Sequence, residues 1–178
     1  MKISVNAPSY KRANDVKTLS YLPFCKIWVD GKEFEDYKRN YPDADIQRCA
    51  DGVQGNVARV RNHILDMEFE RGADVVVIVD DDLLTIERYY AEGENGYLCH
   101  KLENEEFLTF VEKYSIMCED FGFKMWGMNL LKDQLAYKHS VPFSTTKVIL
   151  GPFSAFLKGN QCRYDERLPL KEDYDIFL

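Results

Sequence analysis

The sequence predicts an α/β fold with a mostly parallel central sheet that is flanked by helices. Short β-type runs alternate with amphipathic stretches from one end of the chain to the other, which favours βαβ units. The run Val75–Val79 consists only of β-branched residues, as expected for a strand covered on both faces. The chain has 178 residues, 46% of them hydrophobic, and no internal repeat or low-complexity linker, so we expect one domain over residues 1–178.

Individual elements follow from local patterns. The segments with the length and apolar character of interior strands are residues 2–6, 26–29, 45–49, 74–79, 124–129 and 147–150. Two longer stretches, residues 56–71 and 104–121, carry apolar residues at helical spacing, and a glycine follows each of them as a stop. Because ligands bind beyond the carboxyl ends of the strands in sheets of this type, the residues that follow each strand are the first candidates for a site.

Charge, hydrophobicity and cysteine content argue against several classes of protein. The net charge of −7 argues against broad binding of nucleic acid through a basic surface. No apolar run approaches the roughly 20 residues of a membrane-spanning helix, and the N-terminal residues lack the apolar stretch of a secretory signal. We therefore expect a cytoplasmic protein with no membrane span. The cysteines form no C-x-x-C pair and are predicted to be inert; they are Cys25, Cys49, Cys99, Cys118 and Cys162.

Three consecutive carboxylates follow the strongest predicted strand. In an extended chain Asp80 and Asp82 point to one side and Asp81 points to the other. Two carboxylates at the carboxyl end of a strand form a hard-oxygen site for Mg²⁺ or Mn²⁺, with room for a diphosphate to complete the coordination shell. The alternative is a solvated turn that caps a helix over residues 83–90, since Asp is a favoured N-cap residue.

A second acidic stretch lies near the end of the sequence. If Glu172 begins a helix, Glu172 and Asp175 share a face while Asp173 projects elsewhere. A carboxylate held in a cleft can act as general base toward an acceptor hydroxyl. The alternative is an acidic first turn of a helix, which the helix dipole favours.

The two acidic clusters belong to a longer pattern of motifs in a set order. The motifs are Asn6-Ala7-Pro8-Ser9-Tyr10-Lys11-Arg12, Ala58-Arg59-Val60-Arg61-Asn62, Asp80-Asp81-Asp82 and Tyr164-Asp165-Glu166 before Glu172-Asp173-Tyr174-Asp175. This order resembles the glycosyltransferases of the GT-A fold, closest to the family 2 type, within the nucleotide-diphospho-sugar transferase superfamily. The resemblance spans nearly the whole chain and implies a Rossmann-like three-layer sandwich.

The resemblance also implies a role for each matching position. Asp80 and Asp82 would hold a divalent cation, Mn²⁺ or Mg²⁺, that bridges two phosphates, with Asp81 and Asp82 as the alternative pair. Asp173 would be the general base of an inverting displacement, with Glu172 beside it. The residues expected to contact the nucleotide sugar are Pro8, Tyr10, Arg12, Asp30, Arg61, Asn62 and Asp81.

The expected activity is metal-dependent transfer of a sugar from a nucleotide-sugar donor, a UDP-sugar first of all, to an acceptor hydroxyl. The acceptor classes considered are a protein, a small molecule, an oligosaccharide and a modified nucleobase, with hydroxymethylated DNA bases as the minority hypothesis. A nucleotidyltransferase and a catalytically degenerate nucleotide-binding module are the alternative functions. The sequence ends soon after Asp173, so we expect either a minimal or C-terminally truncated form of the family, or an acceptor site that comes from another chain.

Overall fold

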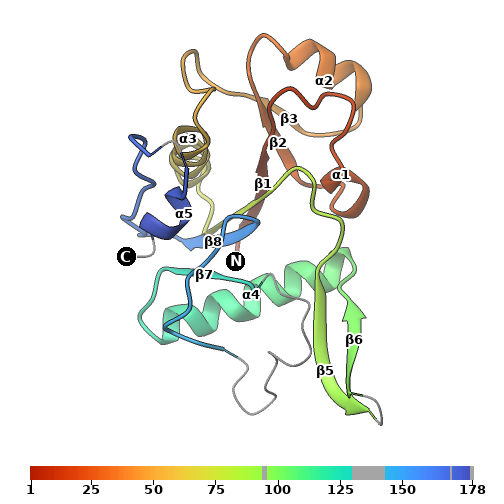
Figure 1. The fold of residues 1–178 in the computed structure, drawn as a ribbon, viewed down its shortest axis with the longest axis vertical. Helices are drawn as coiled ribbons and strands as arrows, with labels where there is room; N and C mark the ends of the chain where they lie inside the picture. Colours follow the sequence, from red (N-terminus) through yellow and green to blue (C-terminus); the bar gives the residue numbers. More distant parts are fainter. Residues whose placement is uncertain (94–95, 130–142, 169, 177–178) are drawn as a thin grey trace.

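A computed structural model describes residues 1–93, 96–129, 143–168 and 170–176 of the chain. Its centre is a six-stranded sheet with the order β3-β2-β1-β4-β8-β7 (Figure 1). The strands are β1 (Ile3–Pro8), β2 (Lys26–Val29), β3 (Ile46–Arg48), β4 (Val75–Val79), β7 (Met125–Gly127) and β8 (Phe153–Leu157). Neighbouring strands from β3 to β4 run parallel, whereas β8 is antiparallel to both β4 and β7. The prediction of a mixed α/β fold with a mostly parallel sheet is confirmed.

Helices cover both faces of this sheet. They are α1 (Thr18–Tyr21), α2 (Phe34–Asn40), α3 (Val57–Glu70), α4 (Asn104–Asp120) and α5 (Glu172–Asp175). Side chains alternate along β4, so that Val76 and Ile78 pack with α3, while the other three valines pack in the core that contains α1, α2 and α4. All five residues of β4 are buried because both faces of the strand are covered.

The long helix α3 forms where the sequence predicts one. The side chain of Asn56 caps it by accepting a hydrogen bond from the backbone N–H of Arg59 at 3.1 Å. Val60, Ile64 and Leu65 face the sheet and are buried. The helix is followed by Gly72 at φ +83°, a left-handed conformation that glycine adopts without strain. The Asn56 cap fixes the N-terminal end of α3 at the edge of the sheet where the candidate site lies.

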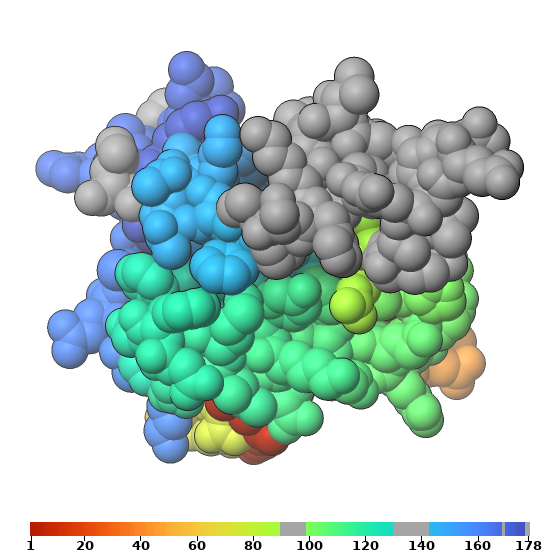
Figure 2. Space-filling model, turned by 90° about the horizontal axis from the view of Figure 1, so that it is seen from below, coloured from red at the N-terminus to blue at the C-terminus, as the bar shows by residue number. Residues whose placement is uncertain are grey.

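The opposite face is covered by α4, again as predicted. A capping box between Glu103 and Glu106 begins the helix, and Phe107, Val111 and Cys118 are buried on its inner side. Figure 2 views the molecule from this side and shows α4 covering much of the face. Within the described part of the chain, no helix is both long enough and apolar enough to cross a membrane.

One sequence expectation is wrong, and one alternative that the sequence left open is not observed. Residues 147–150 form no strand; the strand in this region is β8, which begins at Phe153 and pairs along its length with β4. Its five residues are all buried, so pairing with the central strand decided its position. The helix considered for residues 83–90 is also absent, because β5 (Glu87–Gly93) pairs there with β6 (Gly96–Lys101) in a separate hairpin.

Candidate functional site

A cleft of about 400 Å³ opens at the carboxyl ends of β1 and β4. The strand order reverses between these two strands, because β2 and β3 lie on one side of β1 and β4 lies on the other. The connections after β1 and β4 therefore separate, which is the point where open α/β sheets bind ligands. The walls are the loop after β1, the loop and first turn at the start of α3, and the acidic triplet; they comprise Pro8, Ser9, Tyr10, Arg12, Gln54, Gly55, Asn56, Val57, Val60, Asp80, Asp81 and Asp82.

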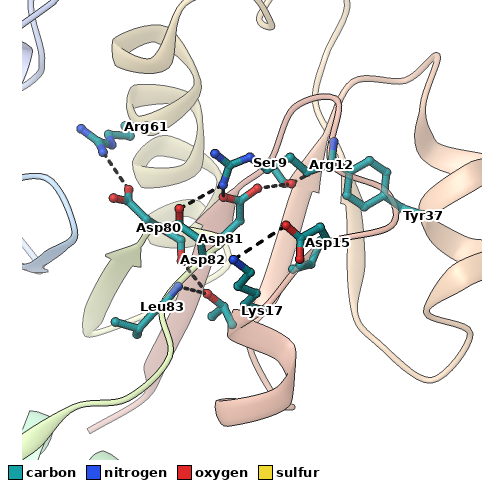
Figure 3. A network of polar contacts seen from close by, with 12 residues as sticks. Ser9, Arg12, Asp15, Lys17, Tyr37, Arg61, Asp80, Asp81, Asp82 and Leu83 are labelled. Carbon is teal, nitrogen blue, oxygen red and sulfur yellow. Dashed lines mark hydrogen bonds and ion pairs between the residues drawn. The ribbon is translucent and has the colours of Figure 1, made fainter.

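The three carboxylates of the acidic triplet differ in exposure. The side chain of Asp81 is 10% exposed, against 36% for Asp80 and 50% for Asp82. Asp81 accepts hydrogen bonds from Ser9 Oγ at 2.5 Å and from Arg12 Nη1 at 2.8 Å, as Figure 3 shows. Arg12 Nη1 also lies 3.1 Å from Asp82 Oδ2. Asp81 therefore fastens the loop after β1 to the end of β4, and both of its oxygens are engaged in doing so.

The backbone of the triplet is held from the side by α1. Thr18 Oγ1 donates to the carbonyl of Asp80 at 2.6 Å, and the backbone N–H of Thr18 donates to the carbonyl of Asp81 at 3.1 Å. The same hydroxyl accepts from the N–H of Leu83 at 2.9 Å. Thr18 is fully buried. Sequence analysis did not single out this residue, and no local pattern around it signals the contact.

A buried tyrosine supports the loop after β1. Tyr37 Oη, from α2, lies 2.8 Å from Ser9 Oγ and accepts from the N–H of Arg12 at 3.0 Å. Burial raises the pKa of Tyr37 above its ordinary value, so the hydroxyl stays protonated at neutral pH. Tyr10 is different, because it is 46% exposed at the cleft and Lys11 Nζ lies 4.9 Å from its ring centre. Tyr37 is a second supporting residue that the sequence did not reveal.

The two acidic clusters meet at one guanidinium. Arg61 Nη1 lies 2.7 Å from Glu172 Oε1, and Arg61 Nη2 lies 3.2 Å from Asp80 Oδ1. The pKa of Asp80 lies above the ordinary aspartate value. Burial is the main cause and the two neighbouring aspartates add to it, while Arg61 acts in the opposite direction. The Arg61 side chain is only 5% exposed and is not among the residues that line the cleft, although its partner Asp80 is.

Next to this pair, Asp173 is held by the backbone. Its Oδ2 accepts from the N–H of Gly151 at 3.0 Å, and its Oδ1 accepts from the N–H of Tyr174 at 3.0 Å. Gly151 is closely surrounded, because a Cβ at that position would lie 3.1 Å from Arg61 Nη2 and 3.6 Å from Asp173 Oδ2. The absence of a side chain at Gly151 leaves room for the Arg61 guanidinium beside the backbone here.

Two other predicted site residues have structural partners. Asn62 accepts from the N–H of Tyr164 and donates to its carbonyl, each at 2.9 Å, and thereby holds the segment that precedes α5. Asp30 accepts from the N–H of Lys32 at 2.9 Å. The described residues that line the cleft include Pro8, Tyr10, Arg12 and the triplet, but not Asp30, Arg61, Asn62, Glu172 or Asp173.

The donor set fits a divalent cation in part. Within the described ranges, no three His, Cys, Asp or Glu side chains are arranged to hold a metal ion by themselves. Asp80 and Asp82 nevertheless offer hard carboxylate oxygens at the cleft, and Mg²⁺ is commonly bound by one or two carboxylates together with waters and substrate phosphates. The local charge also favours a cation, because two adjacent groups, Arg12 with two aspartates and Arg61 with Asp80 and Glu172, together set four carboxylates against two guanidiniums.

Comparison with known proteins does not assign a family. No protein-family model matches the sequence, and no curated protein matches it at a significant level. The residues and geometry of the cleft are therefore the basis on which a function can be argued.

Proposed function

We propose that the cleft binds a nucleoside-diphosphate sugar together with a divalent cation, and that the protein is a metal-dependent glycosyltransferase of the GT-A fold. One observation carries the proposal: Asp80 and Asp82 stand at the end of β4 in a cleft at the reversal of the strand order, opposite the start of α3. The helices on both faces of the sheet agree with a three-layer sandwich.

The donor half of the proposal uses three features of the cleft. Asp80 and Asp82 would hold Mg²⁺ or Mn²⁺, which stabilises the negative charge that develops on a departing nucleoside diphosphate. The Arg12 guanidinium and the N-terminal end of α3 are the positive groups suited to phosphate oxygens. The exposed ring of Tyr10 offers a surface on which a base can stack. UDP-sugars are the first donors to test.

The acceptor half rests on Asp173. Gly151 N–H holds one of its carboxylate oxygens, and the neighbouring Glu172 is anchored by Arg61. In the proposed reaction Asp173 takes the proton of the acceptor hydroxyl as the acceptor oxygen bonds to the anomeric carbon and the bond from that carbon to the phosphate oxygen breaks. Proteins, small molecules, oligosaccharides and modified nucleobases are the acceptor classes to screen.

Binding of the donor nucleotide is the first test. Calorimetric titration with UDP, GDP and CDP, each with Mn²⁺ and with EDTA, should give metal-dependent binding of one nucleotide. Asp80→Asn and Asp82→Asn should each weaken it by about tenfold or more, since they remove metal ligands. Asp36→Asn is the matched control, because this exposed aspartate pairs with Arg39 on α2 and, within the described ranges, with no other charged side chain. Unchanged binding in both triplet variants contradicts the metal site, and tighter binding of UTP than of UDP favours a nucleotidyltransferase.

The role of Asp173 has a separate test. Asp173→Asn should bind UDP and Mn²⁺ as the wild type does, but release UDP from a UDP-sugar about 100-fold more slowly, the size of a typical general-base contribution. Asp36→Asn again serves as the control. Wild-type rates of UDP release and transfer in the Asp173 variant would remove this residue as the base.

A further inference from the structure

Among the residues that the structure describes, Arg61 is the only part of α3 that contacts the end of β4, Gly151 ahead of β8 and helix α5 at once. Its Nη1 bonds Glu172, and its Nη2 bonds Asp80 and lies 3.5 Å from the carbonyl oxygen of Gly151. The Nε atom is buried and has no described hydrogen-bond partner. A buried guanidinium with one unsatisfied donor costs free energy, so its position calls for an explanation beyond packing.

Helix α5 depends on such contacts for its position. It has four residues, far too few to be stable alone, and it begins after Lys171 in the left-handed region at φ +64°. The described side-chain contacts that join it to the rest of the chain are the Glu172–Arg61 pair, the Asp173–Gly151 hydrogen bond and the packing of Ile176 against the core under α3. Of these, only the first involves two charged side chains that are nearly excluded from water.

The adjacency of Glu172 and Asp173 makes this anchor relevant to the site. When Arg61 fixes Glu172, the backbone of the next residue is fixed as well, and Asp173 then meets the N–H of Gly151. We infer that Arg61 is a positioning residue, which holds α5 against the acidic end of β4 and thereby sets the place of Asp173. This inference depends on the proposed function only for the role of Asp173. It also replaces the expectation that Arg61 contacts the nucleotide.

Amide hydrogen exchange measured by NMR tests the anchor without any nucleotide. Arg61→Met removes both ion pairs at similar side-chain length and should speed exchange at Gly151 and Ile176 by about tenfold or more. Arg61→Lys should give an intermediate effect, because one ammonium cannot grip two carboxylates as the fork of a guanidinium does. Arg59→Met is the control on the same helix, since Arg59 bonds Glu166 and not α5. Wild-type exchange at both amides in Arg61→Met overturns the inference.

A second variant covers the case in which Arg61→Met fails to fold. Glu172→Gln leaves α3 and the sheet intact and removes the charge at the other end of the same contact. It should also speed exchange at Gly151, and an unchanged rate there overturns the inference. Exchange in the core strand β4 serves as the internal reference for global stability.

Kinetics separate a positioning role from a donor-binding role. In UDP release from the donor, Arg61→Lys should lower kcat by about tenfold while the donor KM stays within about twofold of the wild type. A raised KM with an unchanged kcat would mean that Arg61 binds the donor, which overturns the inference. If the wild-type protein binds no nucleotide by calorimetry, the proposed function fails, and the exchange rates still decide whether Arg61 holds α5.

Discussion

Replacing Asp81 with Asn separates loop anchoring from metal binding within the acidic triplet. Asp81 is the most buried of the three carboxylates and accepts hydrogen bonds from Ser9 and Arg12. Asp82 is half exposed, and Arg12 is its one side-chain partner in the part of the chain that the structure describes. We expect Asp81→Asn to lower the free energy of unfolding and Asp82→Asn to leave it nearly unchanged. We expect Asp82→Asn to lower the affinity for the donor nucleotide, because it removes a ligand of the proposed metal ion.

The magnitude follows from the contacts. A hydrogen bond to a charged group contributes about 1.5–3 kcal/mol. The Asn side chain keeps one oxygen acceptor and relieves repulsion with its two acidic neighbours, and Arg12 is 46% exposed, so part of the loss is recovered through hydration. We therefore expect a destabilisation of about 2 kcal/mol for Asp81→Asn, which corresponds to a fall in Tm of about 4–8 °C for a domain of this size. For Asp82→Asn we expect less than about 0.5 kcal/mol.

Urea unfolding followed by tryptophan fluorescence measures both values, because Trp28 is fully buried in the folded protein. The comparison is internal, since the two variants carry the same substitution at adjacent positions. Equal losses in the two variants, or no loss in Asp81→Asn, would refute the assignment of Asp81 to the anchoring of the loop after β1.

Three further outcomes are expected. Glu68→Gln should lower the free energy of unfolding in urea by about 3 kcal/mol, because the buried Glu68 carboxylate accepts hydrogen bonds from Ser4, Lys26 and Arg71. Glu70→Gln, at an exposed position on the same helix, should leave the free energy of unfolding almost unchanged. Burial raises the pKa of Glu68, but hydrogen bonds from its three donors outweigh burial, so the pKa lies below the ordinary value. The contribution of Glu68 to the free energy of unfolding is therefore complete above the ordinary pKa and is lost as the pH falls through the folded pKa. A difference in unfolding free energy between wild type and variant that stays constant in acid would contradict this. Phe107→Ala should cost about 3–5 kcal/mol through the cavity left between α4 and the sheet, and a loss under about 1 kcal/mol would mean that the site collapses without strain. In the native protein a thiol reagent such as DTNB should modify the exposed Cys99 and Cys162 much faster than the three buried cysteines. Burial raises the pKa of Cys49 to about 11, and it also raises the pKa of Cys25 and of Cys118.

Elements with a strong local signal could be predicted from the sequence. The β-branched run of β4, the cap and apolar stripe of α3 and the periodicity of α4 each act over a few neighbouring residues, and all three elements lie where they were expected. The strand β8 could not be placed in this way. Its residues Phe153–Leu157 are a strand because they pair with β4, about 75 residues earlier, and the more β-branched residues 147–150 have no such partner.

The same distinction between local features and long-range contacts holds for the candidate site. The chain is not extended through the triplet, because Asp81 and Asp82 lie in a turn and both meet Arg12 Nη1, whereas Asp80 meets Arg61. The position of the three carboxylates at the end of β4 was predicted from the sequence. The partners of these residues were not, because Thr18, Tyr37 and Gly151 carry no motif of their own. Arg61 and Asn62 belong to a recognisable motif, but only the folded chain reveals that both are turned toward the segment around α5.

The Arg61–Glu172 contact spans 111 positions of the chain, and this separation has a consequence for how the molecule is made. The cleft wall formed by Ser9, Arg12 and Asp81 needs only the residues up to Asp81, whereas α5 can dock only after β8 has joined the sheet on the far side of β4. Since chains emerge from the ribosome N-terminus first and long loops close late, we expect the nascent protein to complete the proposed nucleotide side of its site well before the side that carries Asp173.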